Sequence, residues 1–450
     1  MKVHKSFFRS SLFAIFLSLL LSSLCLAYVT AGATTNQFLD LTFNGSGRAL
    51  IPIPGSSQIA REVAIQPDGK LLITGYDNWQ TSNYDVILAR VNPDGSLDST
   101  FGSGGKVITA LTPGNDTGYA VAVQPDGKIV VAGFTQEGGG AVAMVVRYNA
   151  DGSLDSTFGN HGVATANFQP KSSWFLSVAV LDDGRILASG SVDSDDRGFL
   201  LARFKPNGDP DPTLGGHGIV TATLPGGDLN GWDMAIQPNG KVVLGGYFTS
   251  DGGNSDLALT RFNVDGSLDA GFGSHGVVTQ DISAVDYAYG VVVQSDGKIV
   301  LGGRVDRTGL LARYNSDGSY DNSFGNDAHT NYVQTSVPGY DAASFIEIAR
   351  RADDGIAAAT RFSFGSPPVV GITLFDRNGR PDIGVAPGGV ITTTNDGHFA
   401  SDYAILVQPD QKIVLAGYVD MDDTQAYDYD LALWRYSIFS NKIFLPSILK

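Results

Sequence analysis

Short apolar stretches of strand length recur along most of this chain, separated by turns rich in Gly, Asp and Pro. Between residues 119 and 167, four such stretches cover 119–124, 128–134, 143–149 and 162–167. They are rich in Val, Ala and Ile, which favour β-strands. Both faces of the stretches are apolar, as is typical of sheets packed between two other layers. The pattern predicts an all-β fold of many short strands.

Two sequence motifs show that these stretches form one repeat of roughly 57 residues. The first is a tight Pro-Asp-Gly turn, found at 66–70, 124–128, 181–185, 237–241 and 294–298, with degenerate copies at 352–356 and 408–412. The second is the loop Asp-Gly-Ser-Leu-Asp-Ser-Thr-Phe-Gly at 94–102, nearly intact at 151–159 and looser from Asp265 and Asp317. Four strands in each of seven repeats predict a seven-bladed β-propeller, in which blades surround a channel.

Together the two motifs resemble the delta-60 repeat, a β-propeller repeat of bacterial proteins. The resemblance covers about residues 39 to 437 in seven copies. The sixth copy departs most, since Ile383-Gly384 replaces Phe-Gly. The resemblance implies a propeller fold, but no activity and no catalytic residues.

The phase of the repeat predicts how the ring closes. A lone fourth strand, 47–53, precedes the first full repeat, and the last repeat ends at 431–437 without a fourth strand. We therefore expect the N-terminal strand to complete the last blade, which leaves no open sheet edge between the termini. The predicted propeller spans 47–437, with a partial repeat at 34–46 before it and an apolar tail at 438–450.

The first 33 residues have the order of a secretory signal peptide. Basic residues precede an apolar run at 12–26, and Ala31 and Ala33 are small where a signal peptidase cuts. Cleavage near Ala33 predicts a secreted or cell-surface protein with no stable membrane span. It also removes Cys25, the one cysteine, so the mature chain has no disulfide.

The charge of the chain limits its partners. The net charge is −16, and loss of the three basic residues in 1–33 makes it −19. This charge repels phosphate backbones, so nucleic acid is not an expected partner. The expected partner is an extracellular glycan or protein.

Several repeated residues invite a chemical role, but their repetition favours a structural one. His161, His217 and His275 occupy the same turn of three repeats, too far apart around a ring to share one metal ion. An arginine recurs on the third strand at 90, 147, 203, 261, 313 and 435, with Leu374 in the sixth repeat. An aspartate recurs in the following loop at 98, 155, 211, 269, 321 and 382. We expect each pair to form an ion pair that fixes the loop.

No cofactor is expected, and calcium is the weaker alternative. Two acidic loops are candidates for calcium, one with Asp193, Asp195 and Asp196 and the other with Asp420, Asp422 and Asp423. Neither has the spacing of a known calcium loop, so solvated loop charges explain them as well.

The strongest candidate binding residues lie at one repeat position, five residues before the first motif. That position holds Arg61, Tyr119, Leu176, Trp232, Tyr289, Glu347 and Tyr403. Its aromatic members, Tyr119, Trp232, Tyr289 and Tyr403, predict a ligand-stacking rim at the channel mouth, while packing between blades is the alternative. The loops between second and third strands vary most and should surround this mouth, because variable loops commonly carry recognition.

Three functions remain open at this point. The leading hypothesis is an extracellular binding or interaction module, and the alternatives are an enzyme acting on a glycan or other polymer and a purely structural repeat protein. Single acidic or basic residues converging at the channel mouth would favour the enzyme. An aromatic mouth without them would favour binding.

Overall fold

The computed structural model describes residues 36–53, 56–77, 83–137, 139–168, 171–193, 197–325, 330–337, 340, 343–362, 369–395, 398, 400–420 and 429–438. The predicted signal peptide and most of the C-terminal tail lie outside these residues. Neither of the two short 3-10 helices in this part of the chain, η1 (Asn36–Phe38) and η2 (Pro387–Gly389), is long or apolar enough to cross a membrane.

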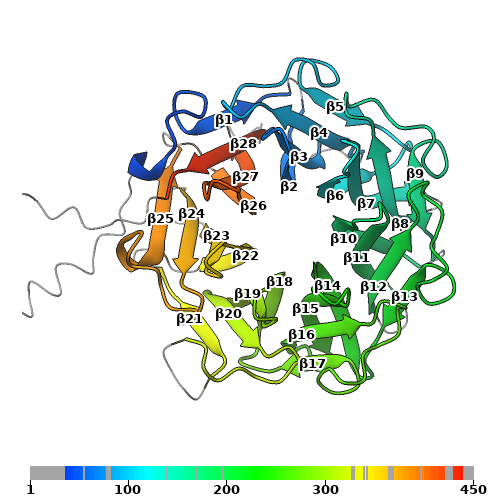
Figure 1. Ribbon diagram of the computed structural model, residues 1–450, viewed down its shortest axis with the longest axis vertical. Coiled ribbons are helices and arrows are strands. Elements are labelled where there is room, and N and C mark those ends of the chain that lie inside the picture. Colours follow the sequence, from blue (N-terminus) through cyan, green and yellow to red (C-terminus); the bar gives the residue numbers. More distant parts are fainter. Residues whose placement is uncertain are drawn as a thin grey trace, which may run out of the picture.

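The described strands form seven antiparallel sheets of four strands each, arranged as blades around a central axis (Figure 1). Blade 1 contains β2 (Ile59–Ile65), β3 (Leu71–Tyr76), β4 (Val86–Val91) and β5 (Lys106–Thr109), and blade 2 contains β6 (Asp116–Val123), β7 (Ile129–Glu137), β8 (Gly140–Tyr148) and β9 (Val163–Ala166). Blade 3 contains β10 (Ser173–Val180), β11 (Ile186–Val192), β12 (Gly198–Phe204) and β13 (Ile219–Ala222), and blade 4 contains β14 (Gly227–Ile236), β15 (Val242–Ser250), β16 (Ser255–Phe262) and β17 (Val277–Gln280).

The remaining three blades repeat this order. Blade 5 contains β18 (Asp286–Val293), β19 (Ile299–Val305), β20 (Thr308–Tyr314) and β21 (Tyr332–Thr335), and blade 6 contains β22 (Ala343–Arg350), β23 (Ile356–Phe362), β24 (Val369–Phe375) and β25 (Val390–Thr394). Blade 7 contains β26 (Ala400–Val407), β27 (Ile413–Asp420), β28 (Tyr429–Tyr436) and, as its outer strand, β1 (Arg48–Ile51). The all-β, seven-bladed propeller predicted from the repeat is confirmed.

Blade 7 closes the ring in the way that the repeat phase predicts. β1 pairs antiparallel with β28, so that Arg48 lies opposite Trp434 and Ile51 opposite Leu431. The N-terminal segment continues this pairing, because Leu39 bridges Tyr436 and the Asp40 amide donates to the Arg435 carbonyl over 2.8 Å. The first and last described strands of the propeller therefore share one sheet.

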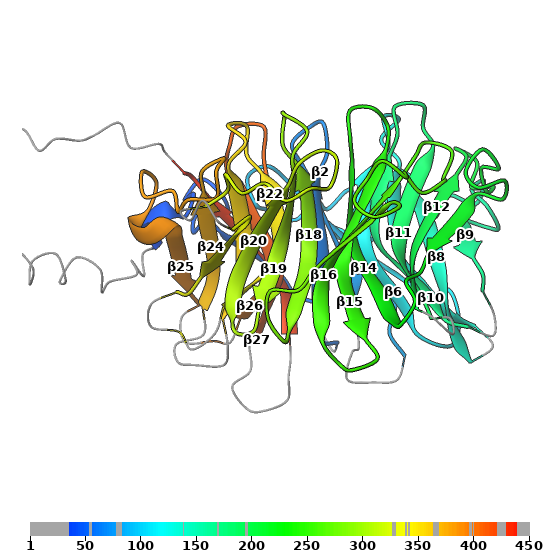
Figure 2. The same ribbon diagram turned by 90° about the horizontal axis from the view of Figure 1, so that it is seen from below.

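Burial follows the position of a strand within its blade. The strands run roughly along the axis of the ring (Figure 2). The third strands of blades 1 to 3, which are β4, β8 and β12, are buried at nearly every residue. Each is packed between its neighbours in the ring, which explains why both of its faces are apolar. Separate apolar clusters fill the seams between blades, and the cluster that joins blades 7 and 1 includes Phe43, Ile51 and Leu431.

A β-bulge in the first strand of each blade positions the side chains that face the channel. The strand register shifts between Ala60 and Glu62 in blade 1, and at the matching place in the other six blades. The residue that pairs with the bulge on the second strand is commonly a glycine, such as Gly75 in blade 1. A side chain does not fit there, because a Cβ at Gly75 would lie only 1.9 Å from the Ile59 carbonyl oxygen. Bulges re-aim side chains, and here the bulged residue and its successor line the channel.

Candidate functional site

The repeated arginines and aspartates form buried ion pairs, as expected from the sequence. The nearest nitrogen–oxygen distances are 2.7 Å for Arg90–Asp98, 2.8 Å for Arg147–Asp155, 2.8 Å for Arg203–Asp211, 2.7 Å for Arg261–Asp269 and 2.6 Å for Arg313–Asp321. Burial of both partners and the repetition of the pair in successive blades indicate a structural role.

The last two pairs depart from the sequence prediction. Arg435 of blade 7 pairs with Asp40 of the N-terminal segment at 2.8 Å, so this ion pair joins the two ends of the propeller. In blade 6, where Leu374 replaces the arginine, Arg351 from the preceding turn binds Asp382 at 2.7 Å. The ion pair is thus retained in blade 6 with a cation from another position.

Sequence reasoning missed a second cation on six of the seven aspartates, all but Asp382 of blade 6. The basic residue that ends each Pro-Asp-Gly turn reaches the same carboxylate: Lys70 with Asp98 at 2.9 Å, Lys128 with Asp155 at 2.7 Å, Arg185 with Asp211 at 3.0 Å, Lys241 with Asp269 at 2.7 Å, Lys298 with Asp321 at 2.7 Å and Lys412 with Asp40 at 3.1 Å. The sequence contained a signal for this contact, because a lysine or arginine ends the first motif in six of its seven copies.

The same arginines also tie each blade to the next. Arg90 donates to the Ala150 carbonyl over 2.5 Å and lies 4.4 Å from the Phe101 ring centroid. Arg203 donates in the same way to the Val264 carbonyl over 2.8 Å. The arginine, its aspartate, the phenylalanine ring and the carbonyl of the next blade recur together, so the second motif is explained as a structural joint between blades. The channel is therefore the candidate functional site.

The four aromatic residues predicted to form a rim line one cavity of about 820 Å³ in the channel. Its lining also contains Asp306 and Arg307, which form the turn between β19 and β20, a loop between second and third strands. The cavity therefore reaches the face of the propeller that carries the varied loops. The aromatic residues of this lining are Tyr119, Trp232, Tyr247, Tyr287, Tyr289, Phe362 and Tyr403.

The rings of this cavity pack in two groups. Trp232 lies edge-on to Tyr289 with centroids 5.1 Å apart, and Tyr287 lies edge-on to Tyr247 at 4.4 Å. Across the channel, the Arg61 guanidinium lies 5.0 Å from the Tyr119 ring centroid and 4.9 Å from that of Tyr403. Part of the aromatic surface is thus used for packing, as the alternative interpretation of these residues expected, while the same rings border the cavity.

Three acidic residues line the same cavity, and each comes from a different blade. They are Glu62 of β2, Asp233 of β14 and Glu347 of β22. Burial raises the pKa of Glu62 to about 8, and the nearby charge of Asp233 adds to the shift. Burial and the charges of Glu62 and Asp233 raise the pKa of Glu347 well above its usual range. A protonated carboxyl group at neutral pH is therefore present in the channel.

Two of these acids also connect blades. Asp233 accepts hydrogen bonds from the Ser177 hydroxyl of blade 3 at 2.9 Å and from the Val291 amide of blade 5 at 2.9 Å. Glu347 accepts one from the Ile405 amide of blade 7 at 3.0 Å. Glu62 accepts from the Val63 amide at 3.0 Å, within its own strand. Among the described residues, Glu62 therefore differs from the other two in making no hydrogen bond across a seam.

The position of the bulge in blade 6 shows that the sequence alignment of the sixth repeat was wrong by one residue. In blade 6 the register shifts between Phe345 and Glu347, so Ile346 occupies the bulged position that Arg61 and Tyr119 hold in other blades. Glu347 instead occupies the position of Glu62. Counting back from the degenerate turn at 352–356 gave the wrong residue, because the turn that matches 66–70 is 351–355, with Asp354 at a φ of 64° in the place of Gly69.

The remaining candidates are not brought together. His161 and His275 are exposed turn residues with φ of 53° and 55°, and His217 bonds the Gly215 carbonyl at 3.2 Å. Asp193 pairs with Arg197 at 3.1 Å, and Asp420 ends β27. Asp195, Asp196, Asp422 and Asp423 lie outside the described residues, so calcium at those two loops stays a prediction.

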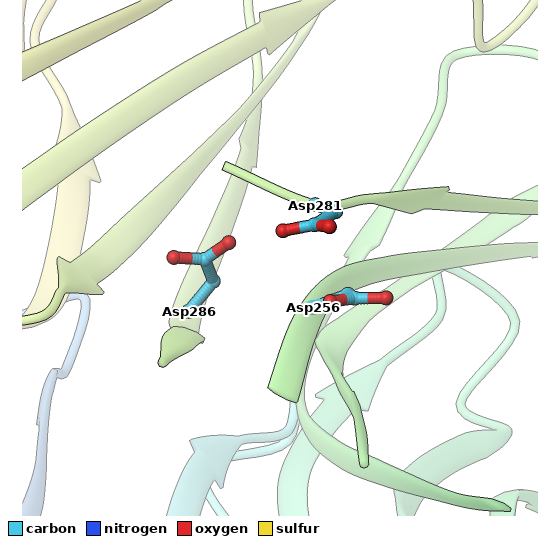
Figure 3. Close-up of side chains that lie close together, drawn as sticks. All are labelled: Asp256, Asp281 and Asp286. Atoms are coloured by element: carbon cyan, nitrogen blue, oxygen red, sulfur yellow. The ribbon is translucent and has the colours of Figure 1, made fainter. Parts of the chain in front are cut away.

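A different acidic group lies between blades 4 and 5. It consists of Asp256, Asp281 and Asp286, whose carboxylates come together from three separate segments (Figure 3). In the part of the chain that the structure describes, this is the one group of three metal-ligating side chains close enough to share an ion.

Comparison with known proteins supports the repeat and the fold. The model of a family described as a domain of unknown function (DUF5122) beta-propeller matches residues 66–101, 124–158, 181–214, 237–272 and 294–324. Five of the seven repeats thus match a β-propeller repeat family. No curated protein matches the chain.

Similar solved structures have different functions. A catalytically inactive virginiamycin B lyase from Staphylococcus aureus with quinupristin is 11% identical, with a TM-score of 0.48 over 86% of this chain and 98% of that chain. A protein of unknown function from Dyadobacter fermentans is 11% identical, with a TM-score of 0.44 over 87% and 98%. Sqt1 from Chaetomium thermophilum, bound to the N-terminus of a ribosomal protein, is 12% identical, with a TM-score of 0.45 over 86% and 98%.

Proposed function

We propose that this chain is an extracellular binding module built of delta-60 repeats, and that its ligand is an extracellular glycan or protein segment held in the channel cavity. The observation that carries the proposal is the cavity itself, which gathers Tyr119, Trp232, Tyr289 and Tyr403 from four different blades. Export rests on the signal-like segment 1–33. No cofactor is part of this proposal.

The cavity has the mixed chemistry that recognition of a sugar or peptide requires. Aromatic rings offer apolar faces for stacking, the lining residues Arg304 and Arg361 offer charged groups for hydrogen bonds, and Glu62 offers a carboxyl group. The volume of about 820 Å³ lies within the range of known ligand sites. A ligand that fits such a site presents both apolar faces and polar edges, as a glycan does.

The test is binding of the mature chain to a glycan and peptide array, followed by the double variant W232A/Y403A. Loss of two stacking rings should weaken binding at least several-fold, since each contributes on the order of 1 kcal/mol. The exposed Tyr320, which lies outside the cavity, provides the control Y320A. Equal binding by W232A/Y403A and Y320A, with both folded, would contradict the proposal.

A second candidate function is an enzyme acting on a glycan or other polymer at the same site. The favouring observation is the convergence of three carboxyl groups from blades 1, 4 and 6, of which Glu62 has a pKa of about 8. A carboxyl group that keeps its proton at neutral pH can serve as a general acid. Release of new reducing ends from array-positive glycans, lost in E62Q, would support this function. Unaltered ligand recovered after long incubation would rule it out for that ligand.

A further inference from the structure

The seam between blades 4 and 5 holds the three aspartates of Figure 3 on the varied-loop side of the ring. Asp256 lies near the start of β16, Asp281 directly follows β17, and Asp286 begins β18. One carboxylate oxygen of each lies within 4.8 Å of the others. Neither the channel cavity nor the arginine–aspartate joints use these residues.

Asp286 has a buried oxygen without a donor. The residue is 0% exposed. Its Oδ2 accepts hydrogen bonds from the amides of Ile282 at 2.6 Å and Ser283 at 3.0 Å. Its Oδ1 has no hydrogen-bond partner among the described residues. The buried Oδ1 of Asp256 also lacks one, as does that of Asp85 at the matching place in blade 1. An unsatisfied buried carboxylate oxygen is costly, so the Oδ1 of the fully buried Asp286 calls for a ligand outside the protein.

The same strand position in blade 2 shows what is different here. Asp116 begins β6, is also 0% exposed, and its Oδ1 accepts hydroxyl hydrogen bonds from Thr135 at 2.5 Å and Thr112 at 3.1 Å. Thr135 lies opposite Asp116 in the sheet, whereas Val305 lies opposite Asp286. The valine side chain has no hydrogen-bond donor, so the hydroxyl that Thr135 offers to Asp116 in blade 2 has no equivalent at this position of blade 5.

Blade 5 gains a charge where it loses this donor. At the seam between blades 1 and 2, Asp85 holds the place of Asp256, and Ala110 follows β5 as Asp281 follows β17. At these matched positions, the seam of blades 4 and 5 thus has the carboxylate of Asp281 where its counterpart has Ala110, and Val305 where its counterpart has the Thr135 hydroxyl. Loss of a donor together with gain of a negative charge is the change that a bound cation would compensate.

Among the described residues, no side-chain cation forms an ion pair with these three aspartates. Asp269, in the arginine–aspartate joint of blade 4, by contrast pairs with both Lys241 and Arg261. Burial and the charge of Asp281 raise the pKa of Asp256, and burial with the charges of Asp281 and Asp256 raises that of Asp286. The local field is thus negative and without a counter-charge from the protein.

We propose that Asp256, Asp281 and Asp286 bind one calcium ion at the seam between blades 4 and 5. All three ligands are oxygens, which hard cations prefer. Two ligands of one ion lie at most twice the metal–oxygen distance apart, about 5 Å for calcium and about 4.2 Å for magnesium. The three carboxylate oxygens, all within 4.8 Å of one another, are close enough to share a calcium ion, whose coordination geometry is the more flexible of the two. Asp281 is exposed, so water can complete the coordination.

The experiment is calorimetric titration of the EGTA-treated mature chain with calcium chloride, together with thermal unfolding. We expect one ion per chain and a higher melting temperature with calcium. D281N should weaken calcium binding by about tenfold or more, because it removes one of three anionic ligands. D281N is the main variant, since an exposed side chain can be changed without disturbing the core. The control is D85N, which removes a carboxylate from the seam of blades 1 and 2 and should keep the affinity of the unaltered chain.

Three results would overturn the assignment. The first is no heat and no melting shift up to about 10 mM calcium chloride, roughly ten times the dissociation constant of the weakest known protein sites, which would mean that the cluster holds protons instead. The second is equal calcium affinity in D281N and the unaltered chain. The third is tighter binding of magnesium chloride than of calcium chloride. None of these results depends on the channel ligand, so failure here leaves the proposed function to its own test.

Discussion

Removal of the Asp40 carboxylate should destabilise the whole propeller, although Asp40 lies outside every described strand. Asp40 accepts hydrogen bonds from the Thr42 hydroxyl at 2.6 Å and from Arg435 at 2.8 Å, and it pairs with Lys412 at 3.1 Å. The change D40A leaves the buried Arg435 without its counter-ion, while the Pro93 carbonyl, 2.6 Å away, remains as its acceptor.

Two independent estimates give the magnitude. Breaking a buried ion pair by removing one partner costs about 3–5 kcal/mol. The pKa of Asp40 is lowered from 3.8 to about 2, since its hydrogen bonds and cations outweigh burial, and a shift of this size corresponds to about 2 kcal/mol. The free energy of unfolding should therefore fall by about 2–5 kcal/mol in D40A.

Urea unfolding followed by tryptophan fluorescence measures this loss, because the fully buried Trp434 lies in β28 beside Arg435. D410A is the matched control: Asp410 also pairs with Lys412, at 3.4 Å, but its side chain is 55% exposed. Exposed pairs contribute about 1 kcal/mol or less. Equal urea midpoints for D40A and D410A would refute the reasoning.

The sign of the pH effect provides a further check. Because the folded-state pKa of Asp40 lies below the unfolded value of 3.8, its stabilisation is present above that pH and is lost as the pH falls towards about 2. D40A should therefore lose less stability than the unaltered chain between pH 4 and pH 2.

Two more predictions concern the joints and the channel. R147A removes the ion pair with Asp155, 2.8 Å away, and a bond to the next blade, so it should lower stability by about 3–5 kcal/mol without abolishing ligand binding. Loss of array binding at an unchanged melting temperature would show that Arg147 belongs to the site. E62Q should flatten the pH dependence of the melting temperature between pH 4.5 and 8, because a pKa raised from 4.5 to about 8 makes the native state lose stability as the pH rises through that window. An unchanged slope in E62Q would contradict the raised pKa.

The architecture was predictable because the repeat encodes it locally. The turn glycines, such as Gly69 with φ of 83° and Gly127 with φ of 83°, need a backbone conformation that few other residues adopt, so their spacing marks the hairpins. Closure followed from counting strands. The arginine–aspartate pairs followed from their common period, and Arg435 was found, but its partner Asp40 precedes the first full repeat and was not assigned to it.

The channel was predictable only in part. The aromatic lining followed from one repeat position, and the same count included Glu347, though only because the turn of blade 6 was aligned one residue late. Glu62 and Asp233 were not found, because they follow the bulged residue and a count from the turn gives only the bulged residue itself. The rarity of Glu, with only three in the chain, was a usable signal, since two of the three line the channel. The seam aspartates have no motif at all. They meet because separate strands of two blades end at the same face.

Ring closure by β1 has a consequence for how the chain is made. The ion pair of Asp40 with Arg435 joins residues 395 positions apart, and β1 pairs with β28, so the first described strand finds its partner last. Until β28 exists, Ile51 and Phe43 have no apolar surface of blade 7 to cover them, and β1 has an unpaired edge. A chain that is cut short therefore cannot form a closed ring, and native stability becomes a property only of the finished polypeptide.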